Sequence, residues 1–126
     1  RGMAAAIELG AAGVQVGTAY LLCHEALTSQ IHRTALKSEA AQHTALTNIF
    51  TGRPARAIVN FAMRELGPIH YGMPEFPLAA SAMAPLRAVM EAQGSGDFSS
   101  LWAGQNVSGC RAISAAELTH ALAVNL

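Results

Sequence analysis

The sequence predicts an α/β fold in which helices dominate and one short strand needs partners. Three observations support this prediction: five or six segments with helical spacing, a single alternating run at residues 13–17, and an alanine-rich composition. Of the 126 residues, 52% are hydrophobic and only 13% are charged. Alanine is the strongest helix former, so this composition favours closely packed helices. A lone strand leaves unpaired N–H and C=O groups along both edges, so we expect further strands to flank it.

The charge balance excludes several classes of partner. Eight basic residues balance eight acidic ones, so no nucleic acid, acidic membrane surface or polyanion is expected as a partner. No apolar run approaches the roughly 18 residues that a membrane span requires. Cys23 and Cys110 lie far apart without a CxxC pair, which favours free thiols in a reducing compartment and a cytoplasmic protein. The five histidines lack ligand spacing, so no metal is expected.

The first half of the chain is predicted to contain three helices and two extended segments. A helix over Gly2–Gly10 is followed by the strand Gly13–Gly17, at the short spacing of an αβ joint. The chain opens inside that helix, so we expect a C-terminal fragment whose own N-terminus lies upstream. A polar helix is expected over residues 25–41 and a strand or extended link over 44–50. Pro54 suits the first position of a helix that runs to about Leu66.

The second half is predicted to be a loop followed by helices. Residues 68–77 combine Pro, Gly, His and Tyr and indicate a loop. A helix is expected over residues 78–93, where Pro85 either starts the main part or kinks it. A short helix is expected within residues 98–113. Ser114 and Glu117 have the spacing of a capping box at the start of the last helix.

The Gly-Thr pair after the predicted strand carries most of the chemical information. Glycine allows close approach of the backbone to a ligand, and amides at a helix start favour phosphate. The Thr18 hydroxyl can add one hydrogen bond. In (β/α)8 barrels, the common phosphate site lies in the loops after strands seven and eight, and Gly13–Thr18 fits strand eight. Considered in isolation, the pair is more often an ordinary tight strand-to-helix turn than a phosphate site.

Three segments resemble those of a known family. The run from Arg1 to Thr18 resembles the part of nitronate monooxygenases (2-nitropropane dioxygenases) that follows the glycine pair of strand seven. It is also similar to the FMN-dependent enoyl-ACP reductases. Phe50–Arg56 with Asn60, and then Leu101–Gln105, resemble two further segments of the same family in the same order. Together the segments cover essentially the whole chain.

The resemblance implies a fold and a domain organisation. The chain would be the C-terminal portion of an FMN-binding (β/α)8 TIM barrel, comprising the last strand, helices and a helical extension, and itself mostly α. Residues 1–24 would form the last βα unit with the phosphate-binding turn. Residues 25–77 would form a family-specific extension, and residues 78–126 the C-terminal helices that pack back on the barrel.

The resemblance also implies a cofactor and a reaction. The amides of Gly17 and Thr18 would hold the FMN phosphate, and Gln15 and Val16 would border the cofactor. The reaction would oxidise nitronates or nitroalkanes with O2 to a carbonyl compound and nitrite. The catalytic base would be a histidine upstream of this chain, so no catalytic residue is assigned and the fragment is expected to be inactive alone. The oligomeric state stays open.

Two alternative functions remain. An enoyl-ACP reductase-like enzyme would use NAD(P)H with FMN, although the residues of the second and third segments resemble the nitronate monooxygenase branch more. A non-catalytic helical interaction module would have no use for the Gly-Thr turn.

Several other side chains have a functional and a structural interpretation. His24 and His70 are the best candidates for a base within the chain, but solvent-facing or loop-packing roles are expected. Arg53 and Arg56 could contact an anion or substrate, or form a salt bridge or cap. Trp102 and Gln105 could line the barrel mouth, although a packing role is commoner for tryptophan.

Overall fold

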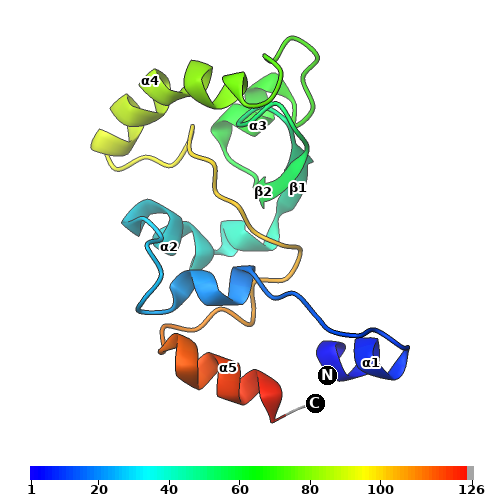
Figure 1. Ribbon diagram of the computed structural model, residues 1–126. Helices are drawn as coiled ribbons and strands as arrows, with labels where there is room; N and C mark the ends of the chain where they lie inside the picture. Colours follow the sequence, from blue (N-terminus) through cyan, green and yellow to red (C-terminus); the bar gives the residue numbers. More distant parts are fainter. Residues whose placement is uncertain (125–126) are drawn as a thin grey trace. The chain divides into compact units, whose positions relative to one another are not determined.

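The computed structural model describes residues 1–124, which divide into two compact units. The terminal unit combines Arg1–Thr28 with Ser108–Leu126, and the central unit is Ser29–Val107. Helices predominate, and the regular strands of the described residues are β1 (Thr44–Thr47) and β2 (Ala55–Ile58), labelled in Figure 1. Within this part of the chain, no helix is long and apolar enough to span a bilayer.

The terminal unit contains two α-helices and one 3-10 helix. Helix α1 (Gly2–Glu8) lies where the sequence predicts a helix, and η1 (Thr18–Leu22) follows the Gly-Thr pair. Helix α5 (Ala115–Ala123) begins with the predicted capping box, which is confirmed. The Ser114 hydroxyl accepts the Glu117 amide at 3.1 Å, and the Glu117 carboxylate accepts the Ser114 amide at 3.0 Å. Two otherwise unpaired amides at the helix start are satisfied in this way.

The prediction of a strand over Gly13–Gly17 is wrong. The structure gives this segment no regular secondary structure, because no other described segment pairs with it. A strand is defined by its ladder of hydrogen bonds, and side-chain alternation alone cannot provide one. The alternation itself has a counterpart in the structure: Val14 and Val16 line the same cavity, whereas Gln15 does not.

The sheet of the central unit pairs β1 and β2 antiparallel. Thr44 faces Ile58 and Thr47 faces Ala55 in the register. The strand or link expected over residues 44–50 is therefore confirmed as β1. The core beside the sheet contains residues from β2, from helix α3 (Phe61–Leu66) and from the turn after β1, namely Ile49, Phe50, Ala57, Ala62 and Met63.

The helix predicted from Pro54 to Leu66 is wrong in its first half. Pro54 precedes β2, where its missing N–H removes no bond from the middle of a ladder. The helix α3 starts only after Asn60, whose side-chain oxygen accepts the Met63 amide at 3.2 Å. The Asn60 amide also donates to the carbonyls of Gly96 (3.0 Å) and Ser99 (2.9 Å). Asn60 is only 6% exposed, so these bonds lock α3 to the segment that follows helix α4 (Leu78–Ala92).

The long helix predicted over residues 25–41 is also shorter than expected. The structure contains α2 (Gln30–Leu36) and a 3-10 turn, η2 (Glu39–Gln42). The Ser29 hydroxyl accepts the His32 amide at 3.3 Å and so sets the start of α2. The Ser38 hydroxyl donates to the Ala35 carbonyl at 2.8 Å, a local bond that competes with helix continuation.

The helix predicted within residues 98–113 is absent from the structure. Residues 101–103 instead lie antiparallel beside β2, with a bridge between Ala57 and Trp102. The Ile58 amide donates to the Leu101 carbonyl at 2.8 Å. The free edge of β2 needs partners for its N–H and C=O groups, and this distant segment supplies them.

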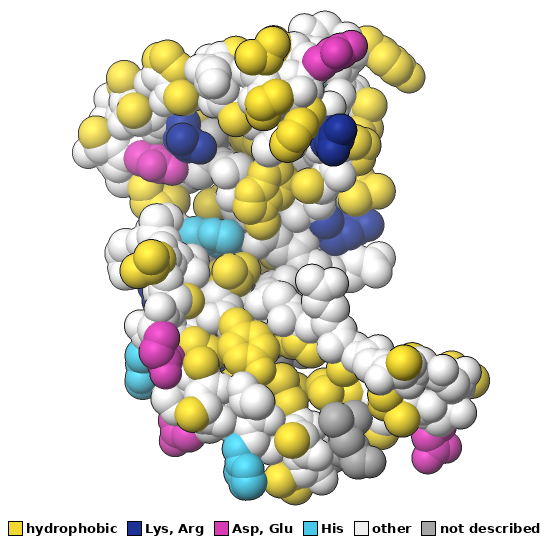
Figure 2. All heavy atoms as spheres, in the orientation of Figure 1, with side chains coloured by type: hydrophobic (Ala, Val, Ile, Leu, Met, Phe, Trp, Pro, Cys, Tyr) yellow, Lys and Arg dark blue, Asp and Glu magenta, His cyan; other side chains and the backbone are white. Residues whose placement is uncertain are grey.

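Helix α4 is continuous and contains Pro85 in its interior. Its Met83 packs against the core of the central unit. Leu78, Leu86 and Val89 are exposed, and Figure 2 shows hydrophobic side chains gathered over the region of this helix. The helix therefore buries one side and leaves apolar groups on the other.

Candidate functional site

The Gly17–Thr18 turn in the terminal unit is open on the side where glycine lacks a side chain. Gly17 is the N-cap of η1 with φ −108° and ψ −66°, and its carbonyl accepts the Tyr20 amide at 3.0 Å. A Cβ atom built on Gly17 would meet nothing within 4 Å. Among the described residues, none accepts a hydrogen bond from the Gly17 amide. This amide is therefore available to a ligand that approaches the backbone closely.

Two contacts with the C-terminal part of the same unit hold η1 in place. The Tyr20 and Thr119 hydroxyls are hydrogen-bonded at 2.8 Å, which joins η1 to α5. The Cys110 thiol donates to the Thr18 carbonyl at 3.1 Å. Burial raises the pKa of the Cys110 thiol, and the neighbouring Cys23 adds to this effect, so the thiol keeps its proton. The turn is thus fixed by residues more than ninety positions away in sequence.

A carboxylate outside α5 adds to the cap of that helix. The oxygens of Glu25 accept the Ala115 amide at 3.0 and 3.1 Å. This bond lowers the pKa of Glu25, and the Ser114 hydroxyl lowers the pKa of Glu117 in the same cap. Both carboxylates are favoured by the partial positive charge of a helix start.

A cavity of about 360 Å³ lies beside the turn within the terminal unit. Its walls include Val14, Val16 and Tyr20 from the N-terminal segment, together with Leu122 from α5. The structure therefore brings Val16 to an apolar cavity next to Gly17 and Thr18. Gln15 is exposed and does not line this cavity.

A pocket of about 420 Å³ in the central unit, lined mainly by residues with polar side chains, was not predicted from the sequence. We call it the Arg56 pocket; its lining comprises Gln42, His43, Thr44, Arg56, Val59 and Gln105. The Arg56 Nη1 atom donates to the Thr44 carbonyl at 3.1 Å and to the Thr44 hydroxyl at 3.3 Å. Two residues whose roles the sequence left open, Arg56 and Gln105, thus share one site.

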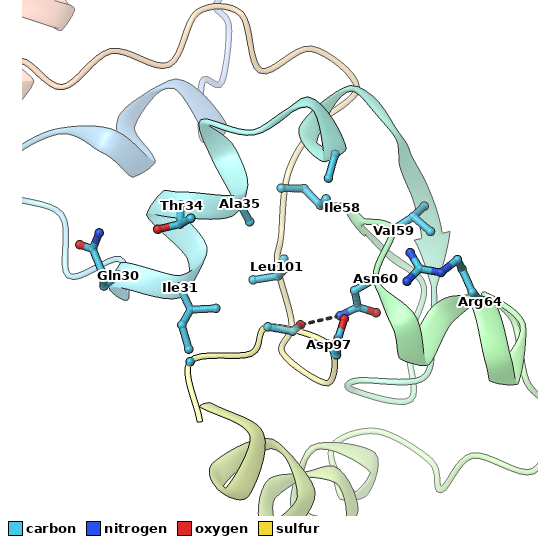
Figure 3. A pocket seen from close by; sticks show the side chains of 13 residues that line it. Gln30, Ile31, Thr34, Ala35, Ile58, Val59, Asn60, Arg64, Asp97 and Leu101 are labelled. Carbon is cyan, nitrogen blue, oxygen red and sulfur yellow. Dashed lines mark hydrogen bonds between the residues drawn. The ribbon is translucent and has the colours of Figure 1, made fainter. Parts of the chain in front are cut away.

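A larger and more apolar pocket also lies in the central unit. It measures about 450 Å³ and lies between α2 and the segment from β2 to α3, with Leu101 between them (Figure 3). The Asn60 amide faces this space, but its hydrogens are bonded to backbone carbonyls, one of which is marked in Figure 3. The Asn60 amide hydrogens are therefore not available to a ligand in this pocket.

Of the remaining candidates, His24 is exposed, and His70, Arg53 and Trp102 make local contacts. The His70 Nδ1 atom accepts the Gly72 amide at 3.1 Å within its own loop. The Arg53 guanidinium lies 4.5 Å from the centre of the Phe76 ring. Trp102 packs edge-to-face on Phe50 at 5.8 Å. In the part of the chain that the structure describes, no three His, Cys, Asp or Glu side chains converge as a metal site.

We expect His32 to make a pH-dependent contribution to the stability of the central unit. Its Nε2 atom lies 2.9 Å from the Trp102 carbonyl, and burial lowers its pKa below 6.5, against a smaller raising effect of that carbonyl. The folded state thus binds the proton less tightly than the unfolded state does. The contribution is present above about pH 6.5 and is lost as the pH falls below it. Urea unfolding measures the free energy of unfolding between pH 8 and 5. This free energy should decrease less for His32→Gln than for the wild type as the pH falls, and an equal decrease in both proteins would contradict the assignment.

Comparison with solved structures defines the class of this fold. The chain is similar to a structure described as "Crystal structures and site-directed mutagenesis study of nitroalkane oxidase from Streptomyces ansochromogenes". The TM-score is 0.87 at 36% identity, and the match covers 98% of this chain and 35% of that chain. The described residues therefore have the fold of the matching third of a nitroalkane-oxidising enzyme.

The family follows from the sequence comparisons. A family model described as nitronate monooxygenase matches residues 1–125. A nitronate monooxygenase of Pseudomonas aeruginosa is 39% identical over 127 residues, which cover 100% of this chain and 36% of the relative. One from Paraburkholderia phytofirmans is 37% identical, covering 93% of this chain and 32% of the relative. The chain belongs to the nitronate monooxygenase family, and the resemblance inferred from the three sequence segments is confirmed.

Proposed function

We propose that this chain is the C-terminal part of an FMN-binding (β/α)8 barrel enzyme that oxidises nitronates or nitroalkanes. Oxygen would be the second substrate, and a carbonyl compound and nitrite the products. The observation that carries the proposal is the family match over residues 1–125. The structural similarity to a nitroalkane oxidase at a TM-score of 0.87 supports the same chemistry.

The activity is proposed for a protein of family length. The chain spans about a third of the relatives that it matches, at 36% and 32% of their lengths. The catalytic histidine and the other flavin contacts of the family would lie in the remaining two thirds. We therefore expect the 126-residue chain alone to oxidise no nitronate.

Two features of the Gly17–Thr18 turn support a phosphate site there. The Gly17 amide is without a partner among the described residues, and the space beside its Cα is open. In our proposal, the Gly17 and Thr18 amides donate to the phosphate, Val16 forms an apolar wall, and Gln15 borders the cofactor. Bound FMN would supply the redox chemistry, while these residues anchor and orient it.

The packing of the terminal unit supports this anchoring role. The Tyr20–Thr119 bond and the Glu25 contact with Ala115 fix the segment after the turn against α5. A donor that is held in place before the ligand arrives loses little conformational freedom on binding. The C-terminal helix would therefore keep the phosphate donors in position.

A substrate comparison on the family-length protein tests the proposal. We expect copurified FMN, oxygen uptake with propyl-2-nitronate, and nitrite as a product. NAD(P)H consumption with a crotonyl thioester, without oxygen uptake on the nitronate, would instead identify an enoyl reductase-like enzyme. A protein that retains no flavin and consumes neither substrate would contradict both enzymes and favour a helical interaction module.

A further inference from the structure

The Arg56 pocket in the central unit combines a fixed cation with neutral hydrogen-bonding groups. Arg56 is half-buried, and the pocket is otherwise lined by two glutamines, a histidine, a threonine and a valine. None of these six lining residues carries a carboxylate. Its electrostatic character is therefore positive, in a chain whose formal net charge is zero.

Backbone hydrogen bonds fix the three segments that form the pocket. Thr44 faces Ile58 across the β1–β2 register. The Val59 amide donates to the His43 carbonyl at 2.9 Å, and the Ala103 amide donates to the Arg56 carbonyl at 3.1 Å. Two of the lining residues, Thr44 and Arg56, thus lie on the paired strands, and the others lie next to hydrogen-bonded residues of this sheet. Sites on paired strands hold their geometry better than sites on free loops do.

The anchoring of Arg56 leaves one edge of its guanidinium available. The group has five N–H donors in a planar fork. The bonds to Thr44 engage Nη1, whose two hydrogens face a carbonyl and a hydroxyl. Nε and Nη2 retain three hydrogens, for which no described residue provides an acceptor. An Nε–Nη2 edge matches the two oxygens of a planar oxyanion in a bidentate arrangement.

We propose that the Arg56 pocket binds a small planar oxyanion, a carboxylate or a nitronate. The Nε–Nη2 edge of Arg56 receives the two oxygens, and the Gln42 and Gln105 amides and the His43 ring can donate further bonds. Val59 provides an apolar contact for a short alkyl group. Binding of a carboxylate is independent of the flavin chemistry, whereas a role in binding the nitronate substrate rests on the function proposed above.

Calorimetric titration of the 126-residue chain with acetate, without FMN, tests the site directly. Saturable binding is expected, with backbone amide NMR shifts at Thr44 and Gln105, while neutral acetamide should not bind. Arg56→Lys keeps the charge but removes the planar pair of donors, so the affinity for acetate should fall roughly ten- to hundredfold. Arg53→Lys is the matched control, because Arg53 lies over Phe76 outside the pocket. The affinity of this variant for acetate should be unchanged.

A second variant keeps the test decisive if Arg56→Lys fails to fold. Gln105 is exposed, so Gln105→Glu leaves the core intact and places a carboxylate beside Arg56. The introduced carboxylate should bind the Nε–Nη2 edge of Arg56 and weaken the binding of acetate by a similar factor. Unchanged acetate affinity in Gln105→Glu, equal binding of acetamide, or no binding of acetate to the wild type would overturn the proposal.

Competition identifies the source of the anion. If propyl-2-nitronate displaces acetate, the site binds the proposed substrate. If acetate binds and the nitronate does not displace it, the site accepts a carboxylate ligand other than the substrate. Loss of acetate binding leaves FMN retention by the family-length protein unaffected, so failure of this proposal is distinguishable from failure of the flavin assignment.

Discussion

Replacing Gly17 by valine should release FMN from the family-length protein while leaving the fold unchanged. A Cβ at this position meets nothing within 4 Å, and the φ of −108° is available to any residue. The branched side chain would instead occupy the space through which a phosphate reaches the Gly17 and Thr18 amides. Loss of one charge-assisted hydrogen bond corresponds to about 1.5–3 kcal/mol, or roughly ten- to hundredfold weaker binding. Fluorescence titration of the apoprotein with FMN measures this change.

Gly13→Val is the matched control for this experiment. Gly13 precedes Gly17 by four residues, and a Cβ there also meets nothing within 4 Å. The variant should therefore bind FMN like the wild type, with the same urea midpoint. If Gly17→Val retained full FMN affinity, the phosphate would have to be held elsewhere and the assignment of Gly17 and Thr18 would fail.

Replacing Gly52 by alanine should cause the largest loss of stability in the central unit. Gly52 has φ +88°, which L side chains rarely adopt. An added Cβ would lie 2.5 Å from the Phe76 amide nitrogen and 2.6 Å from the Pro74 carbonyl oxygen. These are backbone atoms that cannot rotate away. Backbone strain of about 1–3 kcal/mol and overpacking of a similar size predict a loss of roughly 2–6 kcal/mol in the free energy of unfolding, measured with urea.

Gly94→Ala separates the two contributions to this loss. Gly94 has φ +79°, but a Cβ there meets nothing within 4 Å. This variant should therefore lose only the backbone contribution, about 1–3 kcal/mol. A Gly52→Ala variant no less stable than Gly94→Ala would show that the segment of Pro74 to Phe76 does not pack against Gly52 as the structure has it.

Local signals determined the parts of this protein that were predicted correctly. The capping box at Ser114 and Glu117 spans one helical turn, so both partners are visible in a few letters of sequence. The loop and helix boundaries around Pro68 and Leu78 depend similarly on residues nearby. The Gly17–Thr18 turn was singled out because glycine and a helix start together suit phosphate, and its role in binding FMN stays a prediction.

Tertiary pairing decided the rest, because the partners lie far apart in sequence. Ala55–Ile58 has no strong local preference and becomes a strand through β1 and through Leu101–Ala103, which also replaces the predicted helix there. Conversely, residues 13–17 alternate like a strand, but no described segment provides a ladder. The Arg56 pocket arises from the same pairing, since Arg56 and Gln105 share a site only once β2 has bound the segment before Gln105. Backbone groups at a strand edge must find partners, and the folded chain, not the local sequence, determines which segment supplies them.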